Sequence, residues 1–248
     1  MTTALIDADV LAYQAAAACE KATDWGDGLW TLHSFESEVE DAFTAKLRAV
    51  LDAVEATNHI LAFTASNNWR LKVLPTYKGN RADKRKPLLL PYIRTWAMDH
   101  HKSIVIDTLE GDDVLGILAT RGDYPSSVIC SIDKDFKTIP GAFFDFGRDK
   151  TYEITQADAD WWHLYHTLVG DTTDGYKGCP GVGDVGARKI LALEGDPWEN
   201  VVGAFTKAGL NEACALQQAR VARICRSSDY DYLNNSVILW SPTPKETQ

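Results

Sequence analysis

Val-Ile-Cys-Ser-Ile-Asp-Lys-Asp, residues 128–135, is the stretch of sequence that decides the fold. Its apolar half is rich in branched residues, is too short for a typical helix, and is typical of a strand buried on both faces. Similar short apolar runs span residues 4–6, 59–63 and 104–106. Helical patterns lie between them, most clearly at 36–54 and 111–120. This alternation predicts an α/β fold whose mostly parallel central sheet is flanked by helices.

The composition is that of a globular protein of one or two domains, with 248 residues, 45% hydrophobic and 24% charged. No apolar run approaches the roughly 20 residues needed to cross a bilayer, so we expect no membrane partner. Asp7 and Asp9 interrupt the first apolar run, which argues against a signal peptide. Five cysteines without a Cys-x-x-Cys pair fit a reduced compartment. We therefore expect a cytoplasmic protein.

Acidic residues follow the predicted strands with unusual regularity. Carboxyl ends of parallel strands meet at one edge of the sheet, where ligands bind. A single acid at such a place is usually a turn or helix cap, which is how we interpret Asp9. So many negative charges close together require cations. Oxygen ligands select Mg²⁺ or Mn²⁺, and two such ions are suited to hydrolysis of a phosphodiester. The candidate ligands are Asp7, Glu110, Asp112, Asp113, Asp133, Asp135, Asp171 and Asp174.

The net charge of −10 argues at first against a nucleic acid partner, but the charge is unevenly distributed. Residues 67–91 carry seven basic side chains against one acid, Asp83. A solvated loop is the simplest interpretation of such a segment, yet beside an acidic metal centre it would bind phosphate, with Lys78 and Arg81 as the clamp. A glycine-rich stretch, residues 178–191, adds exposed amides at a helix start. The candidate DNA-binding residues are Tyr77 (as a stacking face), Lys78, Arg81, Lys84, Arg85, Lys86, Gly181, Gly183, Arg188 and Lys189.

Taken in order, these motifs resemble those of the 5′ nuclease (flap endonuclease) superfamily, and look most similar to compact bacteriophage 5′ to 3′ exonucleases. The segments that carry the resemblance are Leu5-Ile-Asp7, Tyr77-Lys-Gly-Asn-Arg81, Leu109-Glu-Gly-Asp-Asp113, Ser131-Ile-Asp-Lys-Asp135, Gly170-Asp-Thr-Thr-Asp174 and Gly181-Val-Gly. The resemblance implies a PIN-like fold and a metal-dependent nuclease that acts on DNA at 5′ ends or flaps and releases 5′-phosphates. It also implies activity on RNA in RNA:DNA hybrids and, for a phage enzyme, a place in the host cytoplasm.

The resemblance also implies roles for the candidate residues. Lys78 and Arg81 would be the basic pair at the foot of a helical arch, and Asp133 would serve both ions. The first ion would be held by Asp7, Glu110, Asp112, Asp113 and Asp133, and the second by Asp133, Asp135, Asp171 and Asp174. The catalytic core would span residues 1–155 with the arch region at 67–100. A helical part would span 156–248, with a helix-three-turn-helix at about 175–195 that grips duplex phosphates and can hold K⁺.

One departure from the superfamily pattern leaves alternatives open. The second strand runs into Phe63-Thr64-Ala65-Ser66, where the superfamily places another acid. The first metal site would then be weaker, reorganised around Asp9, or disabled, and a non-cleaving binder of branched DNA or 5′ ends is one alternative. A second alternative is a haloacid-dehalogenase-type phosphotransferase with Asp7 as nucleophile, although it leaves the basic and glycine-rich segments unexplained.

Overall fold

The computed structural model describes residues 1–81 and 84–242, and its centre is a six-stranded sheet of order β5-β4-β1-β6-β7-β8. Strands from β5 to β7 run parallel, and β8 runs antiparallel to β7. The strands are β1 (Thr3–Asp7), β4 (Asn58–Ala62), β5 (Ser103–Ile104), β6 (Ser127–Ser131), β7 (Gly141–Asp145) and β8 (Lys150–Ile154). The predicted mostly parallel α/β fold is confirmed.

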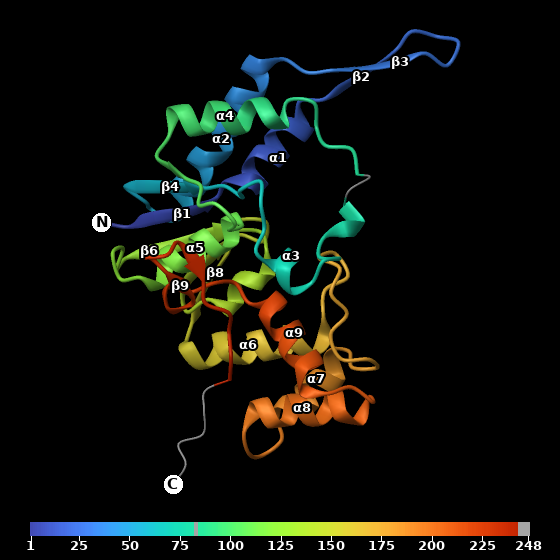
Figure 1. Ribbon diagram of the computed structural model, residues 1–248. Helices are drawn as coiled ribbons and strands as arrows, with labels where there is room; N and C mark the ends of the chain where they lie inside the picture. The colour runs from blue at the N-terminus through green and yellow to red at the C-terminus, as the bar shows by residue number, and fades with distance from the viewer. Residues whose placement is uncertain (82–83, 243–248) are drawn as a thin grey trace.

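Helices cover both faces of this sheet (Figure 1). Because side chains alternate along a strand, Ala4 and Ile6 of β1 pack on one face and Leu5 packs on the other. The first face is covered by α1 (Ala8–Ala18), α2 (Glu36–Ala53) and α4 (Leu90–His100). The second face is covered by α5 (Gly111–Thr120). A strand buried on both sides explains why these sequences read as continuous apolar runs.

Four helices beyond the sheet form a third apolar cluster, in which Leu168, Trp198 and Phe205 are buried. They are α6 (Gln156–Val169), α7 (Asp184–Leu191), α8 (Pro197–Lys207) and α9 (Glu212–Ala222). Thr155 caps α6, and its side chain forms a reciprocal capping box with Asp158. This capping residue therefore sets the start of the helical segment.

The chain then returns to the sheet, which the predicted helical part did not include. Ile224, Cys225 and Tyr230 pack in the same cluster as α5. Two short strands, β9 (Tyr230–Asp231) and β10 (Ser236–Val237), follow there. Residues 82–83 of the predicted arch region and 243–248 of the predicted helical part lie outside the described residues.

Two hairpins were also missed. The strands β2 (Lys21–Asp24) and β3 (Trp30–His33) form an exposed ribbon that projects from the body (Figure 1). Because this ribbon has no buried face, no alternating pattern marks it. Strand β8 pairs with β7 at the sheet edge and is likewise only partly buried.

Within the described part of the chain, no helix is both long and apolar enough to span a membrane.

Candidate active site

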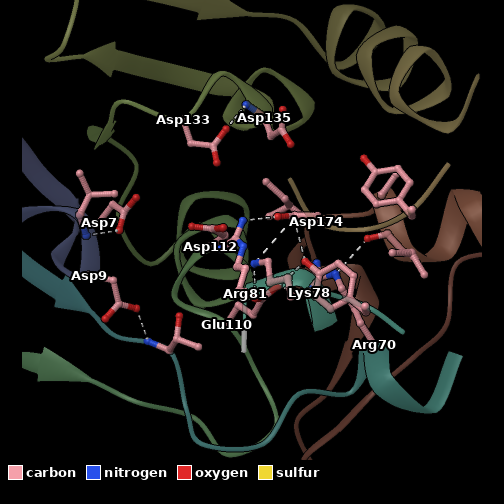
Figure 2. A pocket seen from close by; sticks show the side chains of 17 residues that line it. Asp7, Asp9, Arg70, Lys78, Arg81, Glu110, Asp112, Asp133, Asp135 and Asp174 are labelled. Atoms are coloured by element: carbon pink, nitrogen blue, oxygen red, sulfur yellow. Dashed lines mark hydrogen bonds and ion pairs between the residues drawn. The ribbon is translucent and has the colours of Figure 1, made fainter. Parts of the chain in front are cut away.

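A cavity of about 190 Å³ lies at the carboxyl ends of the parallel strands (Figure 2). Its walls come from β1, from the start of α5, from the loop after β6 and from the loop after α6. Among the described residues, seven carboxylates and three basic side chains line it: Asp7, Asp9, Glu110, Asp112, Asp133, Asp135, Asp174, Arg70, Lys78 and Arg81. The fold thus brings acids from four separate segments of the chain together.

The ends of β1 and β6 are joined through Ser131. Asp7 caps α1, with Oδ1 accepting from Val10 N at 3.2 Å and Oδ2 accepting from Ser131 Oγ at 2.6 Å. The same hydroxyl accepts from Asp133 N at 3.0 Å. Ser131 therefore fixes both carboxylates relative to each other, a role that was not predicted although Ser131 begins one of the segments that carry the resemblance.

Asp133 and Asp135 are arranged by a short 3₁₀ turn, η2 (Lys134–Thr138). Asp133 Oδ1 accepts from Asp135 N at 2.8 Å and so caps this turn. Asp135 Oδ1 lies 3.5 Å from His166 Nε2 of α6, and both atoms are buried without a hydrogen bond. A buried carboxylate oxygen without a donor is an available ligand for a cation.

The loop after α6 places Asp171 and Asp174. Asp171 Oδ1 accepts from Thr173 N at 2.6 Å and from Asp174 N at 3.2 Å, which closes an Asx turn. Asp174 lines the main cavity, whereas Asp171 lines an adjoining one that shares Asp133, Asp135 and Asp174 with it. Of the four predicted ligands of the second ion, Asp171 is therefore the one that does not line the main cavity.

Lys78 and Arg81 enter the cavity from the basic segment, around the 3₁₀ turn η1 (Gly79–Arg81). Lys78 Nζ lies 2.5 Å from Glu110 Oε1 and 3.7 Å from Asp174 Oδ2. Arg81 Nη2 lies 2.5 Å from Asp174 Oδ1. Burial alone would lower the pKa of Lys78, but the charges of Glu110 and Asp174 outweigh it and raise that pKa. Lys78 is therefore a fixed positive charge.

Tyr77 is not the stacking face that we predicted. Its side chain is buried, and its hydroxyl donates to Glu110 Oε2 at 2.9 Å and to Asp174 Oδ2 at 3.0 Å. Charged neighbours also lie over the ring, with Arg70 5.7 Å and Lys78 5.1 Å from its centroid. A base cannot reach the ring, so Tyr77 acts as a support for the two acids.

Asp113 is the one predicted ligand that lines neither the main cavity nor the adjoining one. It is 0% exposed, and its oxygens accept from Arg70 Nη1 at 2.7 Å and Nη2 at 2.8 Å. Trp69 Nε1 and Cys225 N donate to it at 3.0 Å each. Asp112 and Asp113 are adjacent on α5, so when one faces the cavity the other points into the protein. Arg70 itself was missed as a site residue, although it lies in the basic segment 67–91.

The charges divide the cavity into two sides. Burial raises the pKa of Asp7 to about 6 and that of Asp135 to about 8. Burial, together with the charges of Asp7 and Asp133, raises the pKa of Asp112 well above its usual value. Burial would also raise the pKa of Glu110, but Arg70 and Lys78 outweigh it and lower that pKa. The buried acids Asp7, Asp112 and Asp135 therefore differ from Glu110, whose charge Arg70 and Lys78 balance.

These acids are gathered but do not form a finished coordination sphere. Within residues 1–81 and 84–242, no group of three or more acid, histidine or cysteine side chains is arranged to hold a metal ion as it stands. The donor set nevertheless fits a hard divalent cation, because it consists of carboxylate oxygens, and burial raises the pKa of Asp112 and Asp135 among them. Ligands that close around an ion only when it arrives are compatible with this arrangement.

The remaining candidates lie outside the cavity on the surface. Lys84, Arg85 and Lys86 are exposed, and Arg85 pairs with Glu20 at 2.6 Å. Gly181 has a φ of +76°, and Gly183 precedes α7 as its cap. Arg188 pairs with Asp184 at 2.8 Å and lies over the rings of Trp161 and Tyr165, while Lys189 is exposed.

Comparison with known proteins places the chain in a family. The family model for the 5′-3′ exonuclease N-terminal resolvase-like domain matches residues 2–146. The chain belongs to the 5′-3′ exonuclease family. It is 31% identical to the exodeoxyribonuclease of Enterobacteria phage T3, over 96% of this chain and 92% of that protein. It is also 31% identical to the exonuclease of Escherichia phage T7, over 96% and 93% of the two chains.

The predicted membership in the 5′ nuclease superfamily, near the phage exonucleases, and the predicted 5′ to 3′ exonuclease class are thus confirmed. The fold of this 5′-3′ exonuclease matches that of bacteriophage T5 5′-exonuclease with bound zinc, at a TM-score of 0.66 and 14% identity, over 90% and 89% of the two chains. The predicted PIN-like fold is confirmed as well. The haloacid-dehalogenase alternative is wrong, because the family model covers the strand that carries Asp7.

Proposed function

We propose that this chain hydrolyses phosphodiester bonds of DNA as a metal-dependent 5′ to 3′ exonuclease and flap endonuclease. The observation that carries the proposal is the single cavity in which acids from four separate segments face Lys78 and Arg81. The T3 relative is named an exodeoxyribonuclease, which supports DNA as the substrate. The T5 structure with bound zinc supports a divalent cofactor.

Acidic side chains would hold the metal ions, and basic side chains would bind the phosphates of the substrate. Asp7, Glu110, Asp112 and Asp133 would hold one Mg²⁺ or Mn²⁺ ion, and Asp133, Asp135, Asp171 and Asp174 would hold or support a second. We leave Asp113 out of this set because Arg70 occupies both of its oxygens. When bound, such ions would activate the attacking water and stabilise the leaving oxygen. Products would carry 5′-phosphates.

The basic residues would hold the substrate on either side of the scissile bond. Lys78 and Arg81, fixed by Glu110 and Asp174, would donate to the phosphate and offset the charge that develops during cleavage. Farther away, the amides around Gly181 and Gly183, with Arg188 and Lys189, would grip duplex phosphates and could share them with K⁺. Lys84, Arg85 and Lys86 would guide the strand. The same contacts would accept an RNA:DNA hybrid.

Digestion of labelled substrates tests the proposal. A duplex and a 5′ flap, each labelled at the 5′ end in one sample and at the 3′ end in another, would be incubated with Mg²⁺, Mn²⁺ or EDTA. We expect short 5′-labelled products only with metal, a 3′-labelled ladder that shortens with time, and loss of both in Asp133→Asn. Asp149→Asn, in an exposed turn, is the matched control and should cleave normally.

The non-cleaving alternative predicts a different outcome from the same samples. Protein that retards the 5′ flap in a gel but leaves both labels uncut in either metal would overturn the nuclease proposal and favour a binder. An RNA:DNA hybrid included beside the DNA duplex reports the hybrid activity. Product length separates the release of single nucleotides from cleavage at the flap junction.

A further inference from the structure

The cavity wall has a position at which a strand end supplies no acid. Strand β4 runs into Phe63-Thr64-Ala65-Ser66, whereas its neighbour β1 ends at Asp7, and β6, on the other side of β1, is followed by Asp133. In the sheet Asp7 is paired with Ala62, so the residues two positions beyond each, Asp9 and Thr64, come to lie side by side. Thr64 N donates to Asp9 Oδ2 at 2.8 Å. Asp9 therefore stands where the end of β4 has no carboxylate (Figure 2).

Asp9 is held there by an arginine from a third element. Arg94 of α4 forms an ion pair with Asp9 Oδ1, and its Nη2 donates to Thr64 O at 2.8 Å. Its guanidinium also lies 5.1 Å from the centroid of the Phe63 ring. These contacts fix the orientation of the Asp9 carboxylate between β4 and α4.

The same threonine connects Asp9 to the start of α5. Thr64 Oγ1 accepts from Gly111 N at 3.0 Å, and Gly111 directly precedes Asp112. A Cβ on Gly111 would lie 3.3 Å from Ala62 O, so α5 begins in close contact with the end of β4. Asp9, Thr64 and the backbone that carries Asp112 thus form one connected wall of the cavity.

An ordinary first-turn acid of α1 would behave differently. It would face solvent or accept from the amides of its own helix. The hydrogen bond of Asp9 instead goes to β4 and its ion pair to α4, while its side chain lines the cavity and is 27% exposed. Each carboxylate oxygen keeps a further lone pair after these contacts. The orientation therefore serves the cavity and not the helix end.

We propose that Asp9 is an additional carboxylate of the metal site, which takes the place that the end of β4 leaves empty, and that Arg94 is its positioning residue. This inference rests on the proposed function. Asp9 contributes to ion binding beside Asp7 and Asp112, either directly or through a bound water. Arg94 limits the charge repulsion between Asp9 and the other acids before an ion is present.

Metal binding without DNA tests the role of Asp9. The affinity for Mn²⁺, measured by electron paramagnetic resonance and calorimetry, should fall about 10- to 100-fold in Asp9→Asn, the range seen when groups supporting a metal site are changed. Asparagine keeps the acceptor for Thr64 N and removes only the charge. Asp52→Asn, which removes an exposed acid paired with Arg48 on α2, should bind Mn²⁺ as the wild type does.

Two more variants separate a ligand role from a structural one. Arg94→Gln should weaken Mn²⁺ binding several-fold while the circular dichroism spectrum is unchanged. Thr64→Asp added to Asp9→Asn should recover most of the lost affinity, because it returns a carboxylate to the same wall. Recovery in a variant that still lacks Asp9 would not occur if Asp9 merely stabilised the fold.

The outcomes separate this inference from the proposed function. If the wild type binds Mn²⁺ and cuts DNA while Asp9→Asn binds Mn²⁺ equally tightly, the inference on Asp9 is overturned and the nuclease proposal stands. A wild type that binds no Mn²⁺ would overturn both. If Asp9→Asn weakens binding but Thr64→Asp restores nothing, the placement of Asp9 as a substitute for an acid of β4 is overturned.

Discussion

Arg70 and Asp113 form a buried two-bond ion pair, with Nη1 and Nη2 donating to the two carboxylate oxygens at 2.7 and 2.8 Å. Arg70 also donates to Val221 O, at the end of α9, and to Glu110 in the cavity wall. One guanidinium therefore connects the basic segment, α5 and the returning chain. Glu110 of the cavity wall is therefore held by a buried arginine whose two-bond partner, Asp113, lies outside the cavity.

Replacement of Arg70 by methionine should cost about 3–5 kcal/mol in the free energy of unfolding, because it leaves Asp113 buried without its partner. Urea denaturation measures the change. Arg48→Met, which breaks an exposed pair with Asp52, should cost about 0–1 kcal/mol. Arg70→Met combined with Asp113→Leu should lose less than the sum of the single changes, and strict additivity would contradict a coupled pair.

Metal-free protein should lose stability relative to Asp135→Asn as the pH rises from about 4 to 8. The folded-state pKa of Asp135 is raised to about 8 from 3.8, mainly by burial, so the native state keeps a proton that the unfolded chain releases. That stabilisation is complete below the unfolded pKa and is lost as the pH passes the folded pKa. Thermal melts in EDTA measure it. Saturating Mg²⁺ should reverse the loss in the wild type, and parallel curves for the two proteins would refute the assignment.

Lys78→Met should slow cleavage of saturating DNA by about 10²- to 10³-fold while DNA affinity changes much less, because a fixed charge at the reacting phosphate acts in the transition state. Single-turnover kinetics and equilibrium binding separate the two effects. Lys72→Met removes an exposed charge of the same segment and should leave the single-turnover rate unchanged. A loss confined to affinity would show that Lys78 only binds.

Lys189→Ala should weaken DNA binding and reduce the slope of log affinity against log salt by about 0.9, as expected for one lost phosphate contact. Arg188→Ala should act in the same direction. Lys46→Ala on α2 is a control of equal charge change, and its slope should match the wild type. Binding titrations from 50 to 300 mM salt, roughly, cover the range in which such slopes are measured. Unchanged slopes for both α7 variants would remove this helix from the interface.

Gly170→Ala should destabilise the protein far more than Gly209→Ala. Both glycines have positive φ, +71° and +79°, but a Cβ on Gly170 would lie 2.4 Å from Lys177 C, and one on Gly209 would meet nothing within 4 Å. The control therefore reports the backbone strain alone, about 1–2 kcal/mol. Urea denaturation compares the two variants. Equal losses would show that the close approach before Asp171 does not constrain the loop.

The sequence alone determined the architecture and the chemical character of the site. Short apolar runs buried on both faces specify parallel strands locally, and acids placed directly after those runs must meet at one edge of the sheet. Asp7, Asp112, Asp133 and Asp135 could be named for this reason, and Lys78 and Arg81 from their motif. Each of these signals is local, because each acid lies within a few residues of its own strand, so no knowledge of distant contacts was needed.

The tertiary structure decided whether Asp112 or Asp113 faces the cavity, and which residues support the acids that line it. The direction of Asp112 and Asp113 depends on how α5 packs against Arg70, and the burial of Tyr77 depends on α9 and the loop that carries Asp174. Asp9 looked like a helix cap because Thr64 and Arg94, its partners, lie 55 and 85 residues away. Contacts over such separations depend on register and helix rotation, and a local sequence pattern carries neither.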